Sequence, residues 1–387
     1  AGRKDAAPAA GITTDSTHYC EARAVVETGA GFFRTASRPS RDLGVLLARS
    51  LAATGAVRVL DLMAGCGIRS LRYGLEGSVE AVWANDADAD RLPLLHTNLA
   101  PLAGRVDVVA TARTAQHLLA ELALRRDHHE LVDLDAFGAP VDLLPAALEA
   151  VSLGGALYLA STDGRSATGH DRRAAVRRFG AAARAHPASW ELALRLQLGV
   201  VARTAWAQGR GIRPLFSFSE GRTFRTAVGV ERLPGPGEEG LLGLVAHCHG
   251  CGDQQVQSLM ALGRWQACLC GSSGSLAVSG PLWIGPLQDA AVLASMASQA
   301  EQSPHTLGAD GARLLARLQG DTGYPARCWP TDQIARRLGG GPPRLADLVA
   351  ALRAAGHGAS ASGVMAAQVR SDAPWPEVLE ICRRLAL

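Results

Sequence analysis

Three features of the sequence predict an α/β fold built on a doubly wound, mostly parallel sheet. Residues 57–63 form a nearly continuous apolar run, which is typical of a strand covered on both faces. A glycine-containing turn at 64–67 follows, and apolar residues then recur at helical spacing over 68–75. A second apolar run at 79–84 completes a strand, turn, helix and strand, the repeating unit of such a sheet.

The same alternation continues along the chain as far as residue 230. We expect strands at 106–110, 129–135 and 155–161, and helices at 89–99, 115–124 and 142–151. One long helical stretch is predicted over 171–208. Two alternating runs, 215–219 and 223–230, predict a hairpin that completes the sheet.

The sequence divides into three parts. Residues 1–18 have no periodicity and predict a disordered tail. The sheet domain occupies 19–233, and a segment rich in proline and glycine follows it. Residues 241–387 predict a smaller α+β C-terminal domain. Its last helices are expected at 331–338, where Thr331 is the expected N-cap, and at 345–355 and 376–385, in a winged-helix-like unit.

Composition limits the class of protein. The chain has 387 residues, of which 48% are hydrophobic, so it can bury a large core and bulk disorder is excluded. There is no signal peptide and no apolar run long enough to span a bilayer, which predicts a soluble, cytoplasmic protein without a membrane partner. We expect a monomer. The net charge of +3 does not by itself indicate a nucleic-acid partner.

Acidic residues follow three of the predicted strands. Asp61, Asp86 and Asp135 each end a strand, so they should converge at one edge of the sheet, where such folds bind ligands. Asp86 ends the second strand, where a carboxylate can accept hydrogen bonds from both hydroxyls of a ribose. These positions predict a nucleoside-cofactor site.

The glycine turn favours S-adenosylmethionine over a dinucleotide. Gly65 and Gly67 are present, but Ser70 stands where a third glycine of a dinucleotide site would fall. The Asp61 carboxylate would repel a pyrophosphate and attract the cationic groups of S-adenosylmethionine. The alternative interpretation is a buried turn that binds no ligand.

The fourth strand ends in Asp135-Ala136-Phe137-Gly138, which suggests chemistry on an aromatic amine. The lone pair of such an amine is delocalised into its ring, and an oxygen that accepts its N–H favours attack on a methyl group. Asp135 can supply that oxygen and take the proton, and Phe137 can stack on an extruded base. In the alternative interpretation Asp135 is a helix N-cap and Phe137 lies in the core.

Two aromatic residues and a basic loop precede the first strand of the sheet. Ser40 could cap a helix over 42–53. Phe32 and Phe33 are either core residues or rings that stack on a base, and Arg41 could reach a cofactor or a phosphate. Spacing alone does not decide between these interpretations.

Four of the eight cysteines lie close together in the sequence. Cys248 and Cys251 have the spacing of a zinc half-site, whereas only one residue separates Cys268 from Cys270. We expect these four thiols to form a structural zinc knuckle. A hairpin-rich region with reduced thiols is the alternative.

Several of these motifs together resemble the tRNA guanine-26 N2-dimethyltransferase family. The similar segments are Phe32-Phe33, Arg41-Asp42, 61–69, Asn85-Asp86, 133–140, 280–287 and 370–374. The resemblance implies a Rossmann-like class I methyltransferase domain that uses S-adenosylmethionine, followed by a domain that grips tRNA. It also implies a zinc site in some members.

The resemblance implies roles for individual residues. Arg41, Arg69 and Asp86 would hold S-adenosylmethionine, Asp135 would be the catalytic base, and Phe32 and Phe137 would clamp guanine 26 while one or two methyl groups are added to its N2 atom. Ala136 departs from the family pattern, which has proline there. Two other functions stay open: methyl transfer to another RNA or a small amine, and tRNA binding without catalysis.

Overall fold

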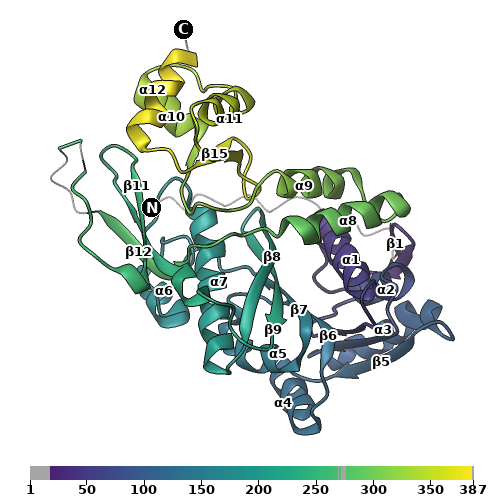
Figure 1. The fold of residues 1–387 in the computed structure, drawn as a ribbon. Coiled ribbons are helices and arrows are strands. Elements are labelled where there is room, and N and C mark those ends of the chain that lie inside the picture. Colours follow the sequence, from purple (N-terminus) through teal and green to yellow (C-terminus); the bar gives the residue numbers. More distant parts are fainter. Residues whose placement is uncertain (1–17, 269, 272–275, 386–387) are drawn as a thin grey trace, which may run out of the picture.

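The computed structural model describes residues 18–268, 270–271 and 276–385, and its centre is a seven-stranded sheet in the order β5-β4-β3-β6-β7-β9-β8 (Figure 1). The first five strands in this order are parallel, and β9 and β8 are antiparallel additions. The strands are β3 (Arg58–Asp61), β4 (Ala81–Asp86), β5 (Asp107–Ala112), β6 (His129–Asp135), β7 (Val151–Ser161), β8 (Gly211–Glu220) and β9 (Thr223–Glu231). The predicted doubly wound sheet and its closing hairpin are confirmed.

Helices cover both faces of the sheet. One face packs against α4 (Ala115–Arg125), α5 (Leu144–Ala150) and α7 (Ser189–Ala207). The other packs against α1 (Arg38–Ala52), α2 (Ile68–Glu76), α8 (Ala290–Gln302) and α9 (Ala309–Gln319), while α3 (Leu92–Leu99) lies beside α2 and β5. Val59 of β3 faces the second set and Leu60 the first. Burial on both faces explains the unbroken apolar run in the sequence.

The single helix predicted over 171–208 is wrong. The structure has two helices, α6 (Arg172–Phe179) and α7, joined by an irregular segment. Gly180 ends α6 in the left-handed conformation with φ of 57°, a common helix stop. Ala182 then exchanges two backbone hydrogen bonds of 2.8 Å with Gly280, so a distant strand stabilises the interruption.

The C-terminal part contains two further three-stranded antiparallel sheets. The first comprises β10 (Leu242–His247), β11 (Gln254–Ser258) and β12 (Ala277–Trp283), and it packs on α7. The second comprises β13 (Cys328–Pro330), β14 (Ala359–Ala361) and β15 (Gln368–Ser371), together with α10 (Thr331–Leu338), α11 (Leu345–Ala354) and α12 (Trp375–Leu385). This unit lies at the top of Figure 1 and fits the predicted α+β end of the chain.

Two predicted helix caps differ from the structure. Pro330, not Thr331, is the N-cap residue of α10, and no side chain accepts a capping hydrogen bond there. Helix α1 starts at Arg38, so Ser40 lies inside its first turn rather than at its cap. The Ser40 hydroxyl donates to the Ser37 carbonyl oxygen at 2.8 Å. Pro39 allows the earlier start, because proline fits the first turn of a helix.

The N-terminal hairpin was not predicted from the sequence. It consists of β1 (His18–Glu21) and β2 (Ala24–Glu27), so the last residue of the predicted tail belongs to a strand. The rest of that tail, 1–17, lies outside the described residues.

Buried contacts cross the predicted boundary at 233–241 between the sheet domain and the C-terminal domain. The division into two domains therefore stays a prediction. Leu282 and Trp283 belong to the same core as the first face of the sheet. Arg370 of β15 pairs with Glu191 of α7 at 2.5 Å and with Asp321 at 2.8 Å, all three side chains being buried. The two parts therefore share both apolar and ionic contacts.

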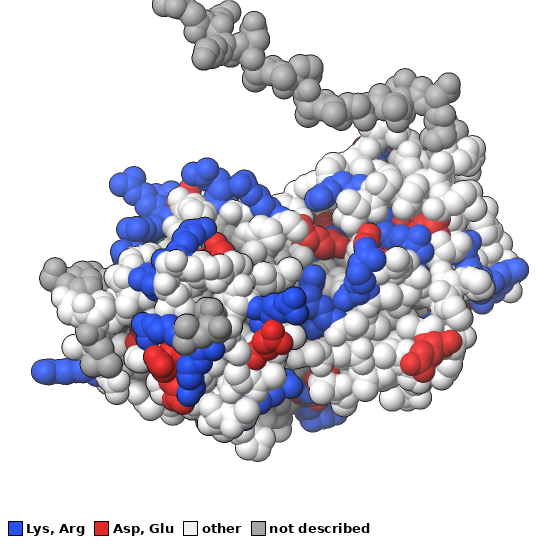
Figure 2. Space-filling model, turned by 90° about the horizontal axis from the view of Figure 1, so that it is seen from above, with Lys and Arg blue, Asp and Glu red and all other residues white. Residues whose placement is uncertain are grey.

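No helix in the described ranges is long and apolar enough to cross a membrane. Figure 2 shows the face seen from above, where Lys and Arg side chains occur in separate groups among acidic and uncharged surface. That face has no single continuous basic field.

Candidate active site

An open cleft with about 970 Å³ of empty space lies at the carboxyl ends of β3, β4 and β6. It brings together most of the predicted site residues, namely Phe32, Arg41, Gly65, Arg69, Asp86, Asp135 and Phe137. Asp61 and Gly67 were also predicted, but they do not line it. The carboxyl ends of parallel strands are where open α/β sheets bind ligands.

One end of the cleft has the features of a nucleoside site. Asp86 accepts hydrogen bonds from the backbone N–H of Gly65 at 2.9 Å and of Asp88 at 3.0 Å, and its side chain is 18% exposed. Gly65 has φ of 58°, and a Cβ placed on it would meet no atom within 4 Å. The turn is therefore held against Asp86 while its backbone faces open space.

The other two residues of this motif lie behind the turn. Gly67 has φ of 80°, and a Cβ on it would approach Leu95 at 3.0 Å, so it packs against α3. Asp61 is fully buried and accepts a hydrogen bond from the Ser70 hydroxyl at 2.7 Å. Burial, together with the nearby Asp133 carboxylate, raises the pKa of Asp61 to about 8.

Asp135 lies between two arginines. Its Oδ2 atom is 2.9 Å from a guanidinium nitrogen of Arg69 and 3.2 Å from one of Arg225. Burial favours the neutral acid, but Arg225 and Arg69 outweigh it and lower the pKa of Asp135 to about 2. The side chain is 26% exposed, so an ionised carboxylate oxygen faces the cleft.

Arg69 contacts the predicted catalytic carboxylate as well as lining the cleft. The guanidinium nitrogen that contacts Asp135 also donates a hydrogen bond to the Ser40 hydroxyl at 3.0 Å, and the other terminal nitrogen lies 3.4 Å from Asp133. The resemblance assigned Arg69 to the cofactor, whereas its contacts in the structure are with Asp135, Asp133 and Ser40. Its charge is therefore directed at the two carboxylates of β6.

Arg41 is fixed by the N-terminal hairpin. Glu21 of β1 accepts two hydrogen bonds from its guanidinium, at 2.5 and 2.8 Å, and the Arg34 carbonyl oxygen accepts a third at 3.1 Å. Although burial opposes ionisation of Glu21, Arg41 and Arg72 lower the pKa of that carboxyl to about 2. Arg41 is therefore held rigidly where it lines the cleft.

The two adjacent phenylalanines have different environments. Phe33 packs edge-on against Tyr19, with ring centroids 4.8 Å apart, and the Arg41 guanidinium lies over it. Phe32 is 66% exposed and meets Phe137, itself 74% exposed, at a centroid distance of 5.3 Å and an interplanar angle of 76°. The structure excludes Phe137 from the core, and Asp135 caps no helix, because Ala139 precedes the next helical turn.

Arg225 is the main residue that the sequence analysis missed. It is buried in β9, which lies next to β7, and β7 pairs with β6 so that Ala160 is opposite Asp135. Arg225 also pairs with Glu220 at 3.0 Å. The sequence does show a charged residue within the apolar strand 223–230. It does not show the order of the strands, which places Arg225 beside Asp135.

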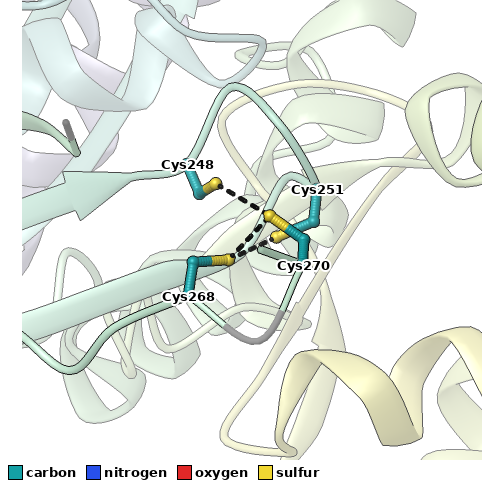
Figure 3. Close-up of side chains that lie close together, drawn as sticks. All are labelled: Cys248, Cys251, Cys268 and Cys270. Carbon is teal, nitrogen blue, oxygen red and sulfur yellow. Dashed lines mark hydrogen bonds between the residues drawn. The ribbon is translucent and has the colours of Figure 1, made fainter. Parts of the chain in front are cut away.

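The four clustered cysteines converge on one point (Figure 3). Their sulfur atoms all lie within 4.8 Å of one another, and measured pairs are 3.0, 3.2 and 3.8 Å apart. Four sulfurs around one zinc ion, with Zn–S bonds of about 2.3 Å, are about 3.8 Å apart. Cys248, Cys251, Cys268 and Cys270 therefore fit a tetrahedral metal site despite the single residue between the last two.

The cysteine loop also contacts the C-terminal helices. Trp375 donates a hydrogen bond to the Cys251 carbonyl oxygen at 2.8 Å, and Trp329 donates to that of Gly252 at 2.8 Å. The two tryptophan rings stack with centroids 5.0 Å apart. The loop thus connects the β10–β12 sheet with the C-terminal unit.

The fold and the cleft define the class of protein. Three features together are typical of a Rossmann-like methyltransferase. They are a doubly wound sheet with seven strands, a glycine turn fixed by the acidic residue that ends β4, and a carboxylate that ends β6 and is followed by an exposed phenylalanine. The chain belongs to the N2,N2-dimethylguanosine tRNA methyltransferase family, whose sequence model matches residues 12–383.

Named relatives and a solved structure agree with this assignment. The chain is 26% identical to the tRNA (guanine(26)-N(2))-dimethyltransferase of Pyrococcus horikoshii over 370 residues, covering 92% of each chain. It is 30% identical to the protein of that name from Aeropyrum pernix over 369 residues, covering 92% of this chain and 89% of the relative. Trm1 from Pyrococcus horikoshii, solved with S-adenosyl-L-methionine, has the same fold, with a TM-score of 0.82 and 24% identity over 94% of this chain and 99% of that one.

Proposed function

We propose that this protein transfers one or two methyl groups from S-adenosylmethionine to the exocyclic N2 atom of guanine 26 in tRNA. Membership of the family and the names of the relatives support the reaction and the substrate. The observation that carries the proposal is the ionised Asp135 carboxylate, which lies in one cleft with two exposed phenylalanines and the Asp86 turn.

The cleft suits S-adenosylmethionine. The partly exposed Asp86 carboxylate would accept the ribose hydroxyls, and the open backbone at Gly65 would pass beneath the nucleoside. Arg41, which lines the same cleft, would attract the α-carboxylate. When bound, the cofactor supplies an electrophilic methyl group on a sulfonium centre.

Asp135 acts on the amine. Its carboxylate accepts an N–H hydrogen bond from N2, which favours a lone pair directed out of the ring conjugation. A carboxyl with a pKa of about 2 is a weak base, but the N-methylated aromatic ammonium is a much stronger acid. Asp135 therefore takes the proton after the new N–C bond has begun to form.

Phe32 and Phe137 hold the base. In the structure their rings meet edge to face at 5.3 Å. A base stacked between two parallel rings needs about 7 Å, twice a normal van der Waals contact distance. The rings must therefore separate as the guanine enters, which both exposed side chains allow.

The four cysteines would hold a structural zinc ion. Their sulfurs meet the geometric requirement, and the loop that carries two of them hydrogen-bonds to Trp329 and Trp375. The ion would stabilise the junction between the β10–β12 sheet and the C-terminal unit, not take part in methyl transfer.

Transfer of labelled methyl from S-adenosylmethionine to unmodified tRNA transcripts, followed by nucleoside analysis, tests the proposed reaction. We expect N2-methylated guanosine with the native protein and none with Asp135→Ala, while tRNA affinity stays nearly the same. Absence of transfer despite measurable binding of cofactor and tRNA would contradict the proposal. A retained rate in Asp135→Ala would remove Asp135 from its role.

A further inference from the structure

A second hollow lies beyond the active-site cleft. It has about 760 Å³ of empty space, and its wall includes Arg165, Thr168, His170, Trp190 and Arg222. A smaller hollow lies between this second hollow and the cleft. It shares Gly164 and Arg165 with the second hollow and Thr162 with the cleft. The three spaces therefore adjoin one another, beginning beside Asp135 and Phe137.

The loop that carries Arg165 is fixed to the active site. Thr162 donates a backbone hydrogen bond to Gly138, the residue after Phe137, at 2.9 Å, and its hydroxyl accepts one from the Gly138 N–H at 2.7 Å. The Arg165 carbonyl oxygen accepts hydrogen bonds from His170 at 2.9 Å and Asp171 at 3.1 Å. The backbone of Arg165 is thus held in place while its side chain is exposed.

Arg222 reaches the same hollow from the turn between β8 and β9. Its methylene groups lie across Gly164, where a Cβ would be 3.1 Å from them. The next residue, Thr223, lines the active-site cleft, and Arg225 contacts Asp135. One hairpin therefore places a cation in the hollow and another at the catalytic carboxylate.

Acidic side chains do not neutralise these two cations. Within the described ranges, neither Arg165 nor Arg222 has a carboxylate within 4.0 Å. The two nearby carboxylates have other partners. Asp163 pairs with Arg178 at 2.5 Å and accepts a hydrogen bond from the Ser166 hydroxyl. Asp171 accepts a hydrogen bond from the Ala174 N–H at 3.0 Å at the start of α6. Two guanidinium groups from separate elements thus face an open hollow without an ionic partner on the protein.

We propose that this hollow binds the RNA strand next to the target base, with Arg165 and Arg222 on its phosphates and Trp190 against a neighbouring base. The proposal rests on the proposed function, because a base extruded into the cleft brings its flanking nucleotides with it. Arginine suits phosphate oxygens, and an aromatic side chain beside the cations suits a nucleobase. Arg165 follows Ala160, the partner of Asp135, by five residues, so it lies within about 18 Å along the chain.

The test compares tRNA binding by the native protein, the Arg165→Gln/Arg222→Gln double variant and an Arg126→Gln control. Arg126 precedes β6 and so lies at the opposite edge of the sheet from Asp135. Dissociation constants for an unmodified transcript are measured between 50 and 200 mM salt, together with cofactor affinity. The double variant should bind on the order of 10-fold more weakly and should lose roughly 0.7 from the slope of log affinity against log salt for each phosphate contact.

The outcomes separate this inference from the proposed function. If the native protein methylates tRNA and the double variant binds with the native affinity and slope, the RNA-strand site is refuted. If the native protein methylates no tRNA, the proposed function fails. A loss of slope in the double variant but not in Arg126→Gln supports the site.

A second variant tests the aromatic wall without removing charge. Trp190→Ala should raise the dissociation constant for tRNA by roughly 5-fold or more, whereas Trp190→Phe should keep most of the affinity, because stacking requires only a flat aromatic face. Melting temperatures confirm that both variants are folded. Equal affinity of folded Trp190→Ala and native protein would remove Trp190 from the site.

Discussion

Replacing Arg225 should move the pH dependence of methyl transfer. Arg225 is 3% exposed and contacts Asp135 at 3.2 Å, and together with Arg69 it keeps the pKa of that carboxyl at about 2. The Arg225→Met variant retains much of the side-chain volume and loses the charge. Arg69 stays in place as the only cation of the pair.

The size of the effect follows from the geometry. A unit charge about 4 Å away is worth about 4 kcal/mol at an effective dielectric of about 20, or about 3 pKa units. Solvent reduces this, since Asp135 is 26% exposed. We therefore expect the pKa of Asp135 in Arg225→Met to rise by about 2 to 3 units, from about 2 to between about 4 and 5.

The measurement is the single-turnover rate of methyl transfer between pH 4.5 and 8. The active form of Asp135 is the carboxylate, which in the native protein persists throughout this range because its pKa lies below it. In Arg225→Met a raised pKa means that protonation begins at the acid end, so the rate should fall as the pH decreases below about 5.5. For the native enzyme and for Arg225→Lys, the rate should not fall at the acid end of this range through protonation of Asp135.

Loss of stability in Arg225→Met has to be distinguished from the change in the pKa of Asp135. Arg225 also pairs with Glu220, so its loss leaves two carboxylates with fewer partners and can lower stability by about 3–5 kcal/mol. Melting temperature and cofactor affinity are therefore measured on each variant. A folded, cofactor-binding Arg225→Met whose rate changes equally at all pH values would refute the electrostatic reasoning.

Three further predictions concern the cofactor, the base clamp and the metal site. Asp86→Ala should weaken cofactor binding by roughly 10- to 100-fold in calorimetry, because hydrogen bonds to a charged group are lost; unchanged affinity would remove Asp86 from the site. Phe137→Ala should lower methyl transfer on tRNA by roughly 5-fold or more while Phe137→Tyr stays near native, and equal rates for both would exclude stacking. Cys251→Ser should release zinc and lower the melting temperature, as a chelator should in the native protein; a metal content of zero in the native protein would contradict the knuckle.

The sequence predicted the elements better than their long-range contacts. Periodicity was sufficient for the sheet because strands such as β3 and β6 are buried on both faces, and a buried strand leaves a continuous apolar run. The break after Phe179 begins at Gly180, a local stop signal that the predicted long helix passed over, and hydrogen bonds from Ala182 to Gly280, which is distant in the sequence, stabilise it. Local patterns thus determine elements but not the contacts that interrupt them.

For the site, too, the sequence predicted which strand ends carry functional residues but not all of their contacts. Asp86 and Asp135 lie where strand ends place them, because parallel strands bring their carboxyl ends to one edge. Asp61 also ends a strand, but its side chain points behind the turn to Ser70. The contact between Arg225 and Asp135 requires the order β6-β7-β9, which a single sequence does not specify.

Two transcripts that differ only at position 26 test the proposed reaction and its target together. Each is incubated with S-adenosylmethionine and the native protein, and the modified nucleosides are located by mass spectrometry. We expect N2-methylguanosine or N2,N2-dimethylguanosine at position 26 of the guanine transcript and no methylation of an adenine-26 transcript. Equal methylation of both transcripts, or modification only at other positions, would contradict the proposed reaction.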